Sequence, residues 1–330
     1  MGVRKTESRI PANLQATDLG QAVMAGDNRC GLVSFISSPL VVNRDNVYVV
    51  FVTDAGLAAS TQTYEWAVSE GGAAPVTQTT DHGEFTYRPL TAGSLSVTVR
   101  LLGAGNAEQA NLHISQDIVA PNAELEGLIT DAANDAGPTV PSPDVARELI
   151  NDHNPYYQAV TLQTPESGDG FKSLVFSMVF DGALQRNPQR RKQTLDQLAA
   201  SLNSQGTDYG TLAAEGAGVC GVRLALLAMV WGSPGPVLPW TELPESSSQR
   251  ANADERLRQD LAALDENIRI DLFNIVRFPK SNITQCGRII EALRDRYFAG
   301  TNFNDVLTGM SGTRAHWITR HFREGPIHRD

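Results

Sequence analysis

Three side chains in the C-terminal half could form the catalytic group of a cysteine hydrolase. Cys220 opens the most apolar stretch of the chain, GAGVCGVRLALLAMVWG at residues 216–232. The pattern predicts a central helix that begins near this cysteine, where free helix amides would stabilise a thiolate. His316 could accept the thiol proton, and Asp330 could orient the imidazole ring. The same thiol could instead be a small buried apolar group, which needs no partner.

The residues around Cys220 and His316 resemble the catalytic segments of papain-like hydrolases. CGVRLALLAMVWG is similar to the cysteine helix of that class, and AHWITRHF at residues 315–322 would be its histidine strand, in a hairpin around residues 323–325. The resemblance implies a cysteine peptidase or amidase, such as an injected effector. However, the residues between the two segments have a helical pattern, whereas that class has a mixed one. We therefore favour a structural Cys220 and keep catalysis as the alternative.

The sequence gives no strong evidence for a catalytic or metal-binding role of Cys286 or of the C-terminal histidines. Cys286, in QCGRIIEAL, is expected at a helix start, and core packing is favoured because no base lies near it in the sequence. Histidines His316, His321 and His328 gather at the C-terminus, but no His-Glu-x-x-His motif or carboxylate set accompanies them. The sequence therefore predicts neither a metal site nor a cofactor.

One dense basic run could contact RNA or phosphate. It consists of Arg186, Arg190, Arg191 and Lys192. RNA binding by a coat protein is the third alternative, and a solvated helix turn is the simpler interpretation. Residues 1–139 carry 15 acidic against 7 basic side chains, which argues against nonspecific nucleic-acid binding by that half.

Length and composition are those of a globular protein with two domains. The chain has 330 residues, 41% of them hydrophobic and 19% charged, and a net charge of −10. Its longest apolar run is too short to cross a membrane, and residues 1–15 lack the apolar core of a secretory signal, so we expect synthesis in the cytoplasm without export by the general route. Three cysteines are too few for a disulfide framework.

The elements that would position these groups change along the chain from β-strands to helices. We expect an N-terminal arm at residues 1–36, a β-rich domain at 37–120, a Pro-rich linker at 121–143 and a mainly helical domain at 144–330. Apolar spacing in the last domain predicts helices over residues 144–150, 171–185, 190–202, 219–231, 253–276 and 283–298, followed by the C-terminal hairpin.

Alternating β-branched segments between Gly, Asn and Asp turns predict an antiparallel β-sandwich in the second segment. Residues 39–119 resemble the PKD and bacterial Ig-like families. The motifs that carry the resemblance are Tyr64-Glu65-Trp66, the strand with Gly83, Phe85 and Tyr87, the turn with Pro89 and Gly93, and the strand with Ser96, Val97 and Val99. The resemblance implies a spacer or docking module in which Trp66 fills the core.

The preferred function is therefore a non-catalytic structural or interaction component of a large assembly, such as a virion, a phage-tail-like particle or a secretion machine. Its partners would be other proteins or further copies of the chain. This expectation combines an Ig-like module, a helical body without a strong catalytic motif, and the absence of an export signal.

Overall fold

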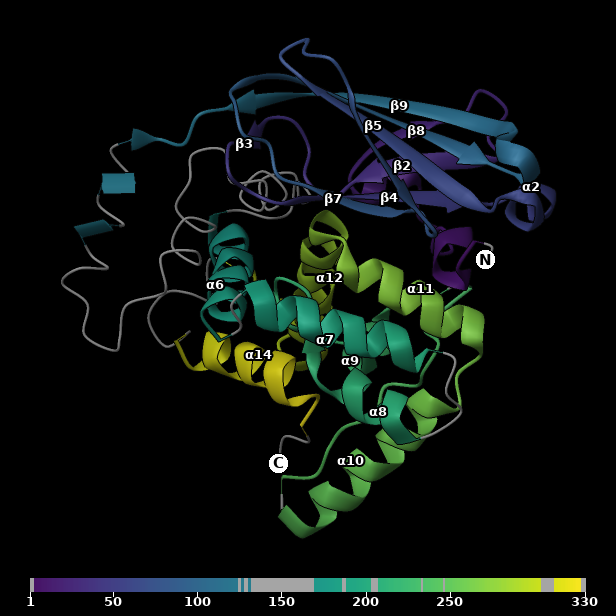
Figure 1. Cartoon of the computed structure of the whole chain (residues 1–330). Helices are drawn as coiled ribbons and strands as arrows, with labels where there is room; N and C mark the ends of the chain where they lie inside the picture. The colour runs from purple at the N-terminus through teal and green to yellow at the C-terminus, as the bar shows by residue number, and fades with distance from the viewer. Residues whose placement is uncertain are drawn as a thin grey trace. The chain divides into compact units, whose positions relative to one another are not determined.

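The computed structural model describes residues 3–123, 126–127, 130–131, 169–185, 188–202, 207–232, 234–245, 247–303 and 312–327. These residues fall into two compact units, one containing those up to Asp131 and the other containing those from Asp169 onward. The first unit is built mainly of β-sheets and the second mainly of helices (Figure 1), so the predicted order of β then α is confirmed. Most of the predicted linker at 121–143 and the helix expected at 144–150 lie outside the described residues.

The first sheet contains residues that the sequence placed in an N-terminal arm. Its strand order is β1 (Gln21–Met24), β2 (Cys30–Ser34), β4 (Asn46–Val52) and β7 (Glu84–Tyr87), all antiparallel. The arm assigned to residues 1–36 is thus corrected, because two strands of this sheet lie within it. β2 reads CGLVS and is buried along its whole length between two neighbours, so it lacks the alternation that marks a half-buried strand.

The second sheet is mixed. Its order is β3 (Leu40–Val41), β9 (Glu108–Val119), β8 (Gly93–Leu102), β5 (Thr63–Glu70) and β6 (Val76–Thr80). Strands β5, β6, β8 and β9 pair antiparallel, but β3 runs parallel to β9, with Leu40 beside Ile118. The expectation of a wholly antiparallel arrangement is corrected at this edge.

Both sheets contribute to one buried apolar cluster. Along β9 the side chains alternate, so that Leu112, Ile114 and Ile118 are buried while their neighbours face solvent. Trp66 on β5 is fully buried, stacks on Phe85 of the other sheet with ring centroids 5.1 Å apart, and donates its indole N–H to Thr80 Oγ1 at 2.9 Å. The predicted role of Trp66 as core filler is confirmed.

The first two described helices of the second unit agree with the helices predicted at residues 171–185 and 190–202. Its described helices are α6 (Asp169–Gln185), α7 (Pro188–Ser201), α8 (Thr207–Ala214), α9 (Leu224–Val230), α10 (Ser247–Ala262), α11 (Glu266–Arg277), α12 (Pro279–Tyr297) and α14 (Gly312–Glu324). The single helix expected at 253–276 is two helices, because the Asp265 side chain accepts the Asn267 N–H at 2.8 Å and so begins α11 as an N-cap.

Two further predictions in this unit are wrong. The central helix is limited to α9, and the residues before it form a hairpin of β10 (Gly216–Ala217) and β11 (Val222–Arg223). The C-terminal segment is the helix α14 rather than a hairpin, since Ile318 and Phe322 are buried at a spacing of four residues. Within the described residues, no helix is both long and apolar enough to cross a membrane.

Candidate functional site

Cys220 lies in the turn of the β10–β11 hairpin and not in the first turn of a helix. The turn places Gly218 and Gly221 in the left-handed region, with φ of 72° and 62°, which a helix cannot include. Cys220 is 4% exposed. Cys220 is therefore not at a helix N-terminus, which is the position expected for a papain-like nucleophile.

The buried side chain of Asn282 on α12 holds this turn in place. Its Oδ1 accepts the Cys220 N–H at 2.9 Å, and its Nδ2 donates to the carbonyls of Ala217 and Val276, each at 3.0 Å. These three hydrogen bonds join the hairpin, the end of α11 and the start of α12. Every polar atom of the amide side chain is thus engaged, as burial requires.

Cys286 lies one helical turn after Asn282 on the same face of α12. It is fully buried, as expected for core packing, but it lies well inside the helix, which begins at Pro279. The side chain of Cys220, in the turn that Asn282 holds, is a neighbour of the Cys286 thiol. Burial, together with this neighbouring thiol, raises the pKa of Cys286 well above its usual value of 9.0.

A small cavity of about 90 Å³ lies beside Cys220. Its lining consists of Met178, Asp181, Gly182, Gly216, Cys220, Gly221, Arg223, Phe322 and Arg323. Arg323 forms an ion pair with Asp181 at 2.6 Å, and Arg223 donates to the Arg323 carbonyl at 3.0 Å. The cavity thus combines one thiol, one carboxylate and two guanidinium groups, with no imidazole among its lining residues.

The structure does not bring His316 to this cavity. His316 is exposed on α14, whereas the α14 residues that border the cavity are Phe322 and Arg323. The buried histidine of this helix is His321, which stacks on Tyr297 at 4.2 Å between ring centroids and accepts the Ile327 N–H through Nδ1 at 2.9 Å. Asp330 and His328 lie outside the described residues.

The basic run does not form one continuous exposed patch. Arg191 is 7% exposed, and Lys192 pairs with Asp196 at 2.9 Å on the surface of α7. Arg190 is exposed, while Arg186 lies outside the described residues. Among the residues that the structure describes, no group of three or more His, Cys, Asp or Glu side chains is arranged to hold a metal ion.

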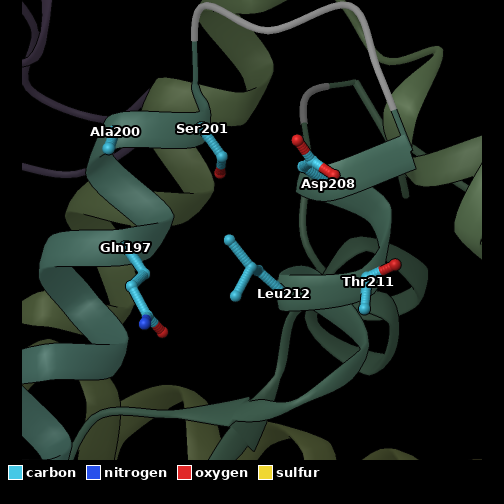
Figure 2. Close-up of a pocket in the computed structure, with 6 residues that line it drawn as sticks. All are labelled: Gln197, Ala200, Ser201, Asp208, Thr211 and Leu212. Atoms are coloured by element: carbon cyan, nitrogen blue, oxygen red, sulfur yellow. The ribbon is translucent and has the colours of Figure 1, made fainter.

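A larger open groove of about 520 Å³ lies between α7 and α8 (Figure 2). It is lined by Gln197, Ala200, Ser201, Asp208, Thr211 and Leu212. The Ser201 hydroxyl donates to the Leu198 carbonyl of its own helix at 2.8 Å, and Asp208 is the single ionisable group of this lining. These residues include no nucleophile paired with a base, so the groove shows no catalytic arrangement.

Comparison with known proteins does not assign this chain to a family. No family model, curated protein or solved structure matches this chain. The resemblance of residues 39–119 to PKD and Ig-like modules therefore stays a prediction, and function has to be inferred from the chemistry and surfaces of the molecule itself.

The most distinctive surface of the first unit is strand β6, which sequence reasoning missed. β6 reads VTQTT, pairs only with β5 among the described strands, and is exposed from Val76 to Thr79. Val76 is 73% exposed although it points to the same face as the buried Val68 opposite it. The Gly71–Gly72 turn and the β-branched residues after it are the signal that could have revealed this strand.

Proposed function

We propose that this chain is a non-catalytic structural or interaction component of a large assembly such as a virion, a phage-tail-like particle or a secretion machine. In this proposal the first unit is an Ig-like β-sandwich that docks through strand addition at β6. The observation that supports it is an exposed edge strand without charges, since unpaired N–H and C=O groups of such a strand are a template for another strand.

The other described sheet edges are less suited to docking. β3 has two residues, and β7 has four and carries Glu84. β1 also has four residues, and its Gln21 side chain donates to the Ser115 carbonyl of β9 at 3.1 Å. Natural edge strands are commonly protected by Lys, Pro, a bulge or shortness. β6 contains no Lys, Pro or bulge, is one residue longer than β1 and β7, and has its nearest proline, Pro75, just before its first residue.

The proposed occupant of β6 is β6 of a second copy, in antiparallel orientation. With Gln78 of one copy beside Gln78 of the other, Thr77 would oppose Thr79, and Val76 would oppose Thr80. No like charges meet in this register, although the chain as a whole carries a net charge of −10. Pairs of β-branched residues are favourable across an antiparallel ladder, so the contact is self-complementary.

Sedimentation velocity over a range of concentrations tests this contact. The wild-type chain should self-associate, and T77K/T79K should weaken association about 10-fold or more, because the proposed register places Lys opposite Lys. The matched control S96K/T98K adds the same charge on the outer face of the central strand β8 and should associate like the wild type. A monomeric wild type, or equal weakening by both variants, would refute docking through β6.

The cysteine-hydrolase alternative receives no comparable support. Its nucleophile would be Cys220, which lies in a buried turn and borders a cavity without histidine among its lining residues. Its proposed base, His316, is exposed on α14. RNA binding through Arg190, Arg191 and Lys192 is likewise disfavoured, because Arg191 is buried and Lys192 is paired with Asp196.

A further inference from the structure

We propose that Cys220 and Cys286 form a dithiol that a small hydroperoxide oxidises to an intramolecular disulfide. This modification site is independent of the docking surface on β6, which belongs to the other unit. It rests on two free, buried cysteines that Asn282 and the spacing of α12 bring together, and on the cavity that borders one of them.

The proximity of the thiols follows from the way the hairpin sits on α12. Asn282 binds the backbone of Cys220 at 2.9 Å, and Cys286 is four residues further along the same helix. Side chains four residues apart in a helix lie on the same face, so Cys286 meets the turn that Asn282 holds. The two thiols are therefore neighbours, as the formation of a disulfide requires.

The two cysteines differ in access. Cys220 borders the cavity, whereas Cys286 is fully enclosed and is absent from the cavity lining. A volume of about 90 Å³ is enough for several water-sized molecules and hence for hydrogen peroxide, but not for a peptide disulfide. Cys220 is therefore the thiol that meets the oxidant, and Cys286 is the resolving thiol.

The charges of the cavity fit this reaction. Among the lining residues, Asp181 pairs with Arg323, and no other carboxylate accompanies Arg223. When a thiolate attacks a hydroperoxide, negative charge develops on the departing oxygen, and a nearby guanidinium stabilises it. Arg223 is suited to this role because it lines the cavity and is anchored to the Arg323 carbonyl.

The reaction has two balanced steps. In the first, Cys220 Sγ forms a bond to one peroxide oxygen, the O–O bond breaks, and the other oxygen leaves as water or an alcohol, so that Cys220 becomes a sulfenic acid. In the second, Cys286 Sγ attacks Cys220 Sγ, and the hydroxyl group leaves as water with the Cys286 proton. The peroxide is reduced and the two thiols are oxidised to one disulfide.

Mass spectrometry of the full-length chain tests the proposal. After treatment with hydrogen peroxide and alkylation under denaturing conditions, the peptides containing Cys220 and Cys286 should be joined, with a mass lower by two hydrogens than their sum. Cys30 should stay alkylatable, since it is buried in β2 and burial raises its pKa to about 11. Oxidised glutathione should form the link at least about 10 times more slowly, because it is too large for the cavity.

Two variants separate the roles of the thiols. C286A should accumulate a sulfenic acid on Cys220 that dimedone labels once the chain is denatured, whereas C220A should leave Cys286 unmodified by peroxide. In the wild type, the link should raise the melting temperature of the helical unit by about 5 °C or more, and dithiothreitol should reverse this shift. Unreacted Cys220 and Cys286, or links only between chains, would overturn the proposal.

Discussion

The side-chain amide of Asn282 fixes the backbone of Cys220, with 2.9 Å between Asn282 Oδ1 and the Cys220 nitrogen. The same amide donates to Ala217 and Val276, so one side chain joins three segments that are far apart in the sequence. Residues 216–223 form a ladder of only two residue pairs. Asn282 therefore replaces the hydrogen bonds that such a short hairpin cannot supply for itself.

Replacing Asn282 by Ala should destabilise the helical unit by about 2–4 kcal/mol. The substitution removes three buried hydrogen bonds and leaves the Cys220 N–H and two carbonyls without their partner. Urea unfolding followed by helical circular dichroism measures the loss. R288A, at an exposed position of the same helix, should change the free energy of unfolding by less than about 0.5 kcal/mol. Equal effects of the two substitutions would contradict the role of Asn282.

Gly218 and Gly221 should respond differently to alanine although both have a positive φ. At Gly221 nothing lies within 4 Å of the position that an added methyl group would take, so G221A should cost only the backbone strain of about 1–2 kcal/mol. At Gly218 the new methyl group would collide with the Val276 carbonyl and the Asn282 amide, so G218A should cost clearly more. Thermal unfolding of the two variants checks the order, and a similar loss in both would show that the close approach at Gly218 is unimportant.

Glu70 should make the stability of the first unit sensitive to acid. Its partial burial would raise its pKa, but hydrogen bonds from Thr91, Tyr87 and Leu90 outweigh burial and hold the pKa below its usual value of 4.5. A lowered folded-state pKa means that the stabilisation is present above pH 4.5 and is lost as the pH falls through the folded-state value.

The matching substitution is E70Q. Above pH 4.5 it should reduce the stability of the first unit by about 1 kcal/mol, and it should flatten the decline of stability in acid. Y87F removes one of the donors, at 2.8 Å, and should give an intermediate slope. Urea unfolding between about pH 2 and pH 7 measures these slopes, and an unchanged acid slope in E70Q would show that other carboxylates dominate.

The sequence was most informative where side chains alternate between core and solvent. β5 and β9 were predicted because Tyr64, Trp66 and Val68, and their counterparts on β9, occur at every second position. β2 and β6 were missed for opposite reasons, since the first is buried on both faces and the second is almost wholly exposed. Neither pattern shows the alternation that identifies a strand from sequence.

The candidate site was less predictable because long-range contacts define it. The apolar run after Cys220 predicted a helix correctly only from Leu224, since nothing local indicates that Gly218 and Gly221 both take left-handed conformations. Cys220 lies near Cys286 because Asn282 holds the hairpin turn on α12, and no sequence spacing indicates this proximity. The apolar residues Ile318 and Phe322 could have indicated that α14 is a helix.

The parallel pairing of Leu40 with Ile118 requires β9, so the second sheet cannot be completed before residues 108–119 are available. β9 lies between β3 and β8 in its sheet, yet it is the last of the described strands of that unit to leave the ribosome. Until it emerges, the inner edge of β8 is open, and nascent chains on one messenger could pair there with one another. Emergence of residues 108–119 therefore ends the stage at which this edge of β8 is exposed, and these residues precede the helical unit, whose described part begins at Asp169.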